Sequence, residues 1–299
     1  MDRRAAPKRA IAYHLEGADD LGECDLDTLE LKARLLELFR APGYTPPLLP
    51  AVALELLAVT RKPNASFGEV VQLLGHDPML AGQVLNIARS ALYSTGEPPR
   101  SLDEAVMRLG LGRVADLFLR VSLEATVFRA AAYREPMDQL RRHSAFTAEA
   151  ARLVSQQTCG LNEYAFLCGL LHDVGSAACI LALSGPLKPL APAGFARAWP
   201  CVRQIHESCS ELLAKLWGLP ADAALVLQLH HAPRVDGRVH PLAAVVRLAD
   251  SFATRAGFGF MSEGNPEDFR ESAAMLGLSE SDLTRLTGTL EQLAARFAG

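Results

Sequence analysis

The sequence predicts an all-α protein. Alanine and leucine are abundant while aromatic residues make up only 6% of the 299 residues, a composition that favours helix. Two capping boxes, Ser66-Phe-Gly-Glu69 and Ser101-Leu-Asp-Glu104, are typical of helix starts. Between residues 60 and 128 the apolar residues show no strand-like alternation. We therefore expect a fold built from helices.

Composition also limits the class of protein. Apolar residues at 49% and charged residues at 21% are ordinary for a soluble globular chain, and the net charge of −4 argues against a strongly nucleic-acid-binding surface. The six cysteines form no CxxC pair, so we expect reduced thiols. The basic start is followed by few apolar residues before Glu16, which argues against a signal peptide. These features predict a cytoplasmic protein.

The chain is long for a single core, and we divide it into three parts. Residues 1–44 are expected to be an arm and a helix, residues 45–130 an N-terminal helical subdomain, and residues 131–299 a helical bundle with a C-terminal helix. Residues 1–26 show no periodicity. The leucines of Asp27–Arg40 recur at helical spacing, which predicts the first helix.

The second part is predicted to contain five or six short helices. Ala51–Thr60 follows a proline-rich stretch, the two capping boxes open further helices, and Leu111–Phe128 closes the region. A His-Asp pair occurs here, His76-Asp77, but Pro78 follows it at once. Asp77 as a helix N-cap explains this pair without a metal.

The third part is predicted to contain longer helices joined by loops. The helices are expected at Met137–Gln157, from Asn162, at Cys201–Trp217, at Ala221–His231, at Leu242–Ala256 and from Ser279 or Ser281. Glycines and prolines in Ser184–Pro200 predict a long loop, which is also a candidate lid. Met261–Asp268 is polar and is expected to be an exposed loop.

One stretch in this part is apolar on every side of a helical projection. Tyr164 to His172 contains no charged residue, so it is expected to be a buried helix, and Asp173 follows it directly. Glycine, proline and Asp173 interrupt the longer apolar run to Leu187, which fits a core helix better than a membrane span. A buried carboxylate is costly unless its charge is compensated. No Lys or Arg lies between Asn162 and Leu187, so a metal ion is the other compensator, and His172 is a second ligand.

Further residues of these types lie on separate predicted helices, and most face inward. The set comprises His143, His172, Asp173, His206, His230, His231 and Asp250. Five histidines with two carboxylates are what a dinuclear site in a helical bundle needs, and imidazoles suit Fe, Mn or Zn. The alternative is a metal-free polar core in which each group has its own hydrogen-bond partner. Both interpretations remain open at this point.

Much of the chain, from about Pro46 to Asp250, resembles the HDOD domain, an HD-related output domain of bacterial signalling proteins. The motifs that carry the resemblance are Leu48-Leu-Pro-Ala-Val-Ala-Leu-Glu-Leu-Leu, His76-Asp-Pro, Asn86-Ile-Ala-Arg-Ser-Ala-Leu-Tyr, Glu104-Ala-Val-Met-Arg-Leu-Gly110, His143-Ser and Gly169-Leu-Leu-His-Asp-Val-Gly175.

The resemblance implies an N-terminal helical subdomain packed on an HD-type helical bundle. Members are usually described as signalling or regulatory modules without proven catalysis. Similarity to the related HD-GYP phosphodiesterases implies two ions, Fe or Mn with Zn as a further option, and a division of the seven ligands. The first ion would take His143, His172 and Asp250, the second His206, His230 and His231, and Asp173 would bridge them.

Two departures argue against phosphodiesterase activity. Hydrolytic relatives commonly carry Gly-Lys after His-Asp, whereas Gly175 is followed by Ser176 here, which removes a cation that could neutralise a phosphate oxygen. No Gly-Tyr-Pro follows His231. The favoured hypothesis is a signalling module, with a signalling protein or a small nucleotide as its partner and no membrane or nucleic acid. The alternative is a metal-dependent phosphohydrolase acting on a nucleotide or cyclic dinucleotide.

Overall fold

The computed structural model describes residues 26–60, 62, 64–93, 96–158, 162–261 and 266–298. Over these residues the chain is helical apart from one short hairpin, so the predicted all-α fold is confirmed. The helix expected at Asp27–Arg40 is α1 (Leu26–Arg40). The arm expected before it lies outside the described residues.

The N-terminal subdomain is arranged around one central helix, α6 (Leu111–Thr126). Four shorter helices contact it: α2 (Ala51–Thr60), α3 (Phe67–Gly75), α4 (Pro78–Ala88) and α5 (Leu102–Leu109). Both predicted serine caps form, with Ser66 and Ser101 accepting from the backbone N–H groups three residues on. Asp77 caps α4, as predicted, by accepting from the N–H groups of Met79 and Leu80.

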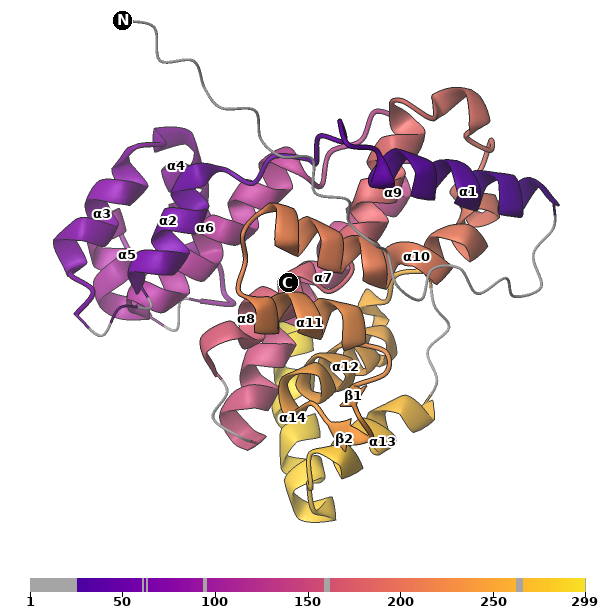
Figure 1. Ribbon diagram of the computed structural model, residues 1–299. Coiled ribbons are helices and arrows are strands. Elements are labelled where there is room, and N and C mark those ends of the chain that lie inside the picture. The colour runs from indigo at the N-terminus through magenta and orange to yellow at the C-terminus, as the bar shows by residue number, and fades with distance from the viewer. Residues whose placement is uncertain are drawn as a thin grey trace, which may run out of the picture.

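The bundle is built around α7 (Arg134–Thr158), which contacts several of the helices that follow it in the chain. Its members are α8 (Asn162–Leu171), α9 (Val174–Ser184), α10 (Phe195–Leu216), α11 (Ala221–Leu229) and α12 (Pro241–Ala253), with a π-turn η2 at Thr254–Phe258. Figure 1 shows the N-terminal subdomain beside this bundle. The N-terminal subdomain therefore packs on the bundle, as the resemblance implied.

Three helices cover the outside of the bundle. Helix α1 packs on α10, α13 (Pro266–Met275) packs on α12, and α14 (Glu280–Ala298) packs on α7 (Figure 1). The buried apolar residues form one continuous cluster that runs from Leu31 to Leu293. The two groups of helices thus share a core, so a change at their interface is expected to affect both.

Helices α8 and α9 contain the most apolar stretch of the described chain. Residues Tyr164–Ser184 have a mean hydropathy of 1.8, which would suffice for a membrane span, but 94% of the most apolar window is buried inside the fold. The chain breaks at His172-Asp173, where α8 ends and α9 begins. Burial against α7 and α10 explains the apolar composition.

The loop predicted at Ser184–Pro200 is confirmed over residues 185–194 but ends earlier than predicted. It holds a 3-10 turn, η1 (Lys188–Leu190), and α10 already begins at Phe195 with Pro200 inside the helix. A proline inside a helix removes one backbone hydrogen bond. Phe195 and Ala198 are buried on this first turn, and their packing outweighs the local preference.

Two other elements were missed. The loop expected at Met261–Asp268 gives way at Pro266 to α13, whose first turn carries acidic residues that suit a helix N-terminus; residues 262–265 lie outside the described part. A hairpin of β1 (Arg234–Val235) and β2 (Arg238–Val239) follows α11. Asp236 and Gly237 have φ of 49° and 77°, and a type I′ turn needs positive φ at both positions.

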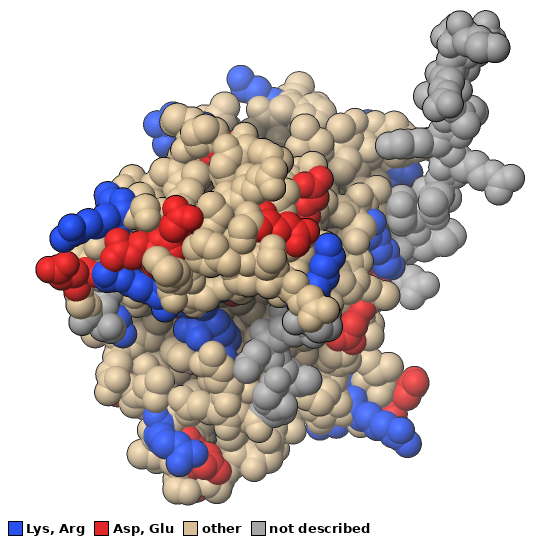
Figure 2. Space-filling model, turned by 90° about the vertical axis from the view of Figure 1, so that its left-hand side faces the viewer, with Lys and Arg blue, Asp and Glu red and all other residues tan. Residues whose placement is uncertain are grey.

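Charges of both signs are mixed on the face formed by the N-terminal subdomain. Figure 2 shows Lys and Arg side chains beside Asp and Glu side chains there, and no continuous basic surface among the described residues in view. Exposed ion pairs of this subdomain include Arg100–Glu97 at 3.4 Å and Lys62–Glu69 at 3.6 Å. This mixture differs from the basic stripe that nucleic-acid binding needs.

Candidate metal centre

The seven residues singled out from the sequence come together in the middle of the bundle, from three helices, the turn between two others and the end of a further helix. His143 lies on α7, His172 and Asp173 form the turn between α8 and α9, His206 lies on α10, His230 and His231 follow α11, and Asp250 lies on α12. They form two neighbouring groups. The first is His143, His172 and Asp250, and the second is Asp173, His206, His230 and His231.

The first group is tightly clustered. The Nε2 atoms of His143 and His172 lie 3.0 Å apart, and Oδ1 of Asp250 lies 3.3 Å from His143 Nε2 and 4.0 Å from His172 Nε2. His143 and His172 are buried, whereas Asp250 is part-exposed. Two imidazoles and one carboxylate thus aim their ligand atoms at one point.

The second group contains one carboxylate and three imidazoles, one imidazole more than the first group. His206 Nε2 lies 3.1 Å from His231 Nε2, and Asp173 Oδ1 lies 3.3 Å from His206 Nε2 and 3.5 Å from His230 Nε2. His206 and His230 are buried, while His231 is exposed. This group therefore opens to solvent at His231.

Asp173 connects the two groups. Its Oδ2 lies 3.6 Å from His172 Nε2 and 3.7 Å from His143 Nε2, while its Oδ1 faces the second group. Asp173 Oδ1 and His230 Nε2 are buried and have no hydrogen-bond partner among the described residues. Buried polar atoms are nearly always satisfied, so orphaned ligand atoms facing one another fit a cation between them.

The imidazole tautomers lead to the same conclusion. Nδ1 of His143 lies 2.9 Å from the carbonyl of Phe258, and Nδ1 of His172 lies 2.9 Å from the carbonyl of Gly169. A carbonyl can only accept, so each Nδ1 carries the proton and each neutral ring presents a lone pair at Nε2. Two lone pairs 3.0 Å apart repel unless a proton or a metal ion lies between them.

His206 and His230 are oriented in the same way. Their Nδ1 atoms each lie 2.8 Å from a carbonyl one turn earlier in the chain, those of Arg203 and Leu227. Metal-binding histidines usually donate their second ring N–H to a carbonyl or carboxylate, which fixes the ring and its tautomer. Four of the five imidazoles therefore have the orientation that a metal site requires.

Protonation suits metal binding at His172 and Asp173, whereas His230 has to lose a proton to bind a metal. Burial lowers the pKa of His172 to about 4, so this ring is neutral at neutral pH. Burial also lowers the pKa of His230, but Asp173 and Glu207 raise it by more, to about 9, so a metal ion has to displace a proton from this ring. Burial raises the pKa of the Asp173 carboxyl, but the imidazoles of His172, His230 and His206 lower it by more, and the net pKa is well below its usual value. Neutral imidazole and ionised carboxylate are the forms that bind metal. The residues present thus fit two divalent ions held by the two groups, with Asp173 between them.

The histidines left outside the set have other roles where they are described. His76 is exposed beside its capping Asp77. His240 caps α12, and its Nε2 lies 3.2 Å from Oδ1 of Asp222 at the surface. Neither belongs to a cluster of ligand atoms.

A second buried charge was missed by the sequence analysis. Glu149 of α7 is buried, and it accepts hydrogen bonds from Tyr93 at 2.6 Å, from Arg113 at 2.9 Å and from Arg152 at 3.3 Å. Tyr93 and Arg113 belong to the N-terminal subdomain, so this cluster joins the subdomain to the bundle. An isolated carboxylate between the alanines of Ala148-Glu-Ala-Ala151 is the signal that could have found it.

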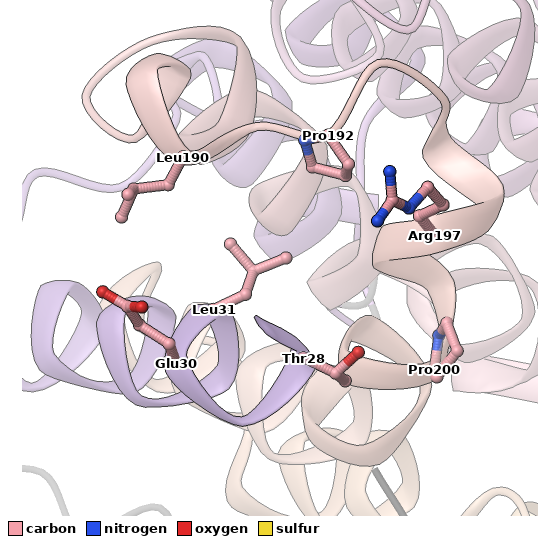
Figure 3. A pocket seen from close by; sticks show the side chains of 7 residues that line it. All are labelled: Thr28, Glu30, Leu31, Leu190, Pro192, Arg197 and Pro200. Atoms are coloured by element: carbon pink, nitrogen blue, oxygen red, sulfur yellow. The ribbon is translucent and has the colours of Figure 1, made fainter. Parts of the chain in front are cut away.

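A cavity of about 420 Å³ lies away from the metal ligands, between α1, η1 and the start of α10. Figure 3 shows Arg197 and Glu30 on different sides of it with Leu31 between them. The stretch that was considered a candidate lid lines this cavity through Leu190 and Pro192. Its lining mixes both charges with apolar side chains and contains none of the seven clustered residues.

Known proteins share the sequence pattern and the fold of this chain. A sequence model of the HDOD domain matches residues 47–233. Over 213 residues the chain is 24% identical to an uncharacterized protein of Treponema pallidum. The matched region makes up 68% of this chain, and the chain spans about two fifths, 41%, of that protein's length.

Three crystal structures are similar over most of the chain. An HDOD domain protein of unknown function from Geobacter sulfurreducens has a TM-score of 0.70 at 23% identity, covering 90% of this chain and 98% of its own. A candidate metal-dependent phosphohydrolase from Shewanella amazonensis has a TM-score of 0.69 at 20% identity, covering 91% of this chain and 99% of its own. A candidate signal transduction protein from Marinobacter aquaeolei has a TM-score of 0.65 at 21% identity, covering 91% of this chain and 66% of its own. At these identities the likeness shows the fold.

Replacing a buried ligand tests the metal assignment. We expect His172→Ala to lower the bound metal and the melting temperature, because an ion that binds only the folded form stabilises it, by about 2.7 kcal/mol at a hundred times the Kd. Melting with and without a chelator, together with metal analysis, measures both effects. The chelator should lower the melting temperature of the wild type by more than that of the variant, which keeps only the second group of ligands intact. His76→Ala, at the surface His-Asp pair, should behave as the wild type; equal metal content in both variants would contradict the assignment.

Proposed function

This chain belongs to the HDOD domain family, and on that premise we propose that it is a regulatory signalling module whose bundle holds two divalent ions without phosphodiesterase turnover. The observation that carries the proposal is the pair of ligand groups that meet at the buried Asp173, whose Oδ1 accepts no hydrogen bond from the described residues. The ions would be Fe or Mn, with Zn as a further option, because imidazole and carboxylate suit all three.

The surroundings of the site support binding without turnover. Ser176, at the position where hydrolytic relatives carry Lys, is fully buried, and its hydroxyl has no partner among the described residues. No cation can be offered to a phosphate from this position. After His231 the chain forms the hairpin of β1 and β2 in place of a Gly-Tyr-Pro segment.

One observation favours the alternative, a metal-dependent phosphohydrolase for a nucleotide or cyclic dinucleotide. His231 is exposed and the side chain of Asp250 is 19% exposed, so each ligand group has one member that reaches solvent. Two ions about 3.5–4 Å apart would supply Lewis-acid chemistry and hold a phosphate. This chain's own residues would place the substrate beside the two members that reach solvent and orient the imidazoles through the carbonyls of Phe258 and Gly169.

Metal analysis followed by a hydrolysis screen separates the two functions. The full chain is purified, its Fe, Mn and Zn contents are measured, and phosphomonoesters, nucleotides and cyclic dinucleotides are tested with added Mn or Fe. Stoichiometric metal without turnover is the expected result. Hydrolysis that depends on metal and is lost in Asp173→Ala would establish the alternative, and absence of bound metal would exclude both.

The remaining parts of the proposal concern the surroundings of the protein. We propose a cytoplasmic location, and a signalling protein or small nucleotide as the partner. The mixed charges on the face of the N-terminal subdomain support a protein or nucleotide partner more than nucleic acid (Figure 2).

A further inference from the structure

Asp173 occupies the N-cap position of α9, but its side chain makes no hydrogen bond to the first turn of that helix. Aspartate is among the strongest N-cap residues, and its usual partners are the N–H groups of the second and third helical residues. In α9 the second residue is Gly175.

The same chain contains the ordinary arrangement for comparison. Asp77, in the other His-Asp pair, accepts hydrogen bonds from the N–H groups of Met79 and Leu80 at 3.1 and 3.0 Å. These are the second and third residues of α4. The two aspartates thus share sequence context and helix position but use their carboxylates differently.

A serine from another helix occupies the place that Asp173 leaves. Ser210 Oγ accepts a hydrogen bond from the N–H of Gly175 at 2.8 Å and donates one to the carbonyl of His172, also at 2.8 Å. Ser210 is fully buried. One hydroxyl therefore satisfies the N-terminus of α9 and the last turn of α8, on both sides of Asp173.

The backbone of Gly175 lies very close to the backbone of α10 around this serine. A Cβ added to Gly175 would lie 2.0 Å from the carbonyl oxygen of His206 and 2.7 Å from the backbone nitrogen of Ser210. The turn that carries His172 and Asp173 therefore rests directly on α10. Ser210 follows His206 by four residues, which places both on one face of that helix.

We propose that Ser210 is a positioning residue that caps α9 in place of Asp173 and so leaves the Asp173 carboxylate free to bridge two metal ions. This inference rests on the proposed metal centre and adds how the bridging ligand is kept from its local hydrogen bonds. Without the hydroxyl, the N–H of Gly175 is left unsatisfied, and Asp173 can satisfy it only by turning away from the imidazoles.

The test is Mn(II) binding to the metal-free full chain, measured by calorimetry, with electron paramagnetic resonance to detect coupled pairs of ions. In Ser210→Ala we expect an affinity about 10–100-fold weaker, as is typical when a group that orients a metal ligand is removed, and loss of the coupled pair. Ser210→Thr keeps the hydroxyl and should restore both. Ser272→Ala is the matched control, because Ser272 is equally buried and its hydroxyl has no hydrogen-bond partner among the residues that the structure describes.

The outcomes are distinguishable. If the wild type binds two Mn(II) ions and Ser210→Ala binds them as tightly, the positioning role is wrong while the metal centre stands. Equal weakening in Ser272→Ala would also overturn it, since loss of any buried hydroxyl would then suffice. A wild type that binds no Mn(II), Fe(II) or Zn(II) refutes the metal centre itself, and this inference with it. If Ser210→Ala does not fold, Ser210→Cys replaces it; a thiol is a weak partner, so wild-type affinity in that variant would contradict the role.

Discussion

Asp173→Ala is expected to reduce the bound metal from two ions to less than one per chain. The carboxylate faces His143 and His172 with one oxygen and His206 and His230 with the other, so its removal takes a ligand from both groups at once. It also removes a negative charge that offsets two divalent cations in a buried site. Metal analysis of protein purified with and without added Mn measures the effect.

Two further substitutions make this result specific. Asp250→Asn should weaken only the first ion, because Asp250 belongs to the group of His143 and His172. Asp222→Asn should change nothing, because Asp222 pairs with His240 at the surface, outside the cluster. A metal content in Asp173→Ala equal to that of Asp222→Asn would mean that the ions, if bound, lie elsewhere.

Glu149→Gln is expected to destabilise the fold by about 3 kcal/mol, the lower end of what removing one partner of a buried ion pair costs. Its carboxylate is 1% exposed and compensates Arg113 and Arg152. The Arg113 guanidinium also lies 5.0 Å from the centre of the Tyr93 ring. The lower end applies because the two arginine side chains keep 21% and 18% exposure and can recover some hydration.

Urea unfolding of the full chain measures this loss. Glu97→Gln is the matched control: Glu97 pairs with Arg100 at 3.4 Å, but both side chains are about 80% exposed, so the expected change is below about 0.5 kcal/mol. Glu149 lies outside the metal cluster, so the folded variant should keep its metal. Equal stability of the two variants would show that the buried cluster does not join the subdomains energetically.

The contribution of Glu149 should also depend on pH. Burial raises the pKa of its carboxyl, but Arg113 and Arg152 lower it by more, so the folded pKa lies below the usual value of 4.5. The stabilisation is then fully present above pH 4.5 and is lost as the pH falls through the folded pKa. The difference in unfolding free energy between wild type and Glu149→Gln should therefore shrink over the acidic range below pH 4.5. A difference that stays constant over this range would contradict the pKa.

Much of the helical fold and the composition of the candidate site could be predicted from the sequence. Capping boxes at Ser66 and Ser101 act locally, so they can be recognised without a structure. The isolated charge of Asp173 at the end of an apolar run was also a local signal. The features that were missed depend on contacts between distant segments. The proline in α10 is tolerated because Phe195 is buried, which no local pattern reveals.

Ser210 illustrates the same limit at the site. A single serine in an amphipathic helix has no pattern of its own, and its importance comes from the approach of Gly175 and His172, which lie 35 and 38 residues away in the chain. Ligand types can thus be predicted from residue chemistry. The groups that hold ligands in place require the packing of one helix on another.

The ring of His143 is held by a residue far along the chain, and this has a consequence for the end of the protein. Its Nδ1 donates to the carbonyl of Phe258, just after the bend at Gly257. The Phe258 ring stacks on Phe146 at 4.4 Å and meets the edge of Phe297 of α14 at 5.2 Å between centroids. Shortening the last helix would therefore loosen one imidazole of the first group without deleting any ligand. A tag or fusion that disturbs α14 would therefore act on the candidate metal centre through Phe297 and Phe258.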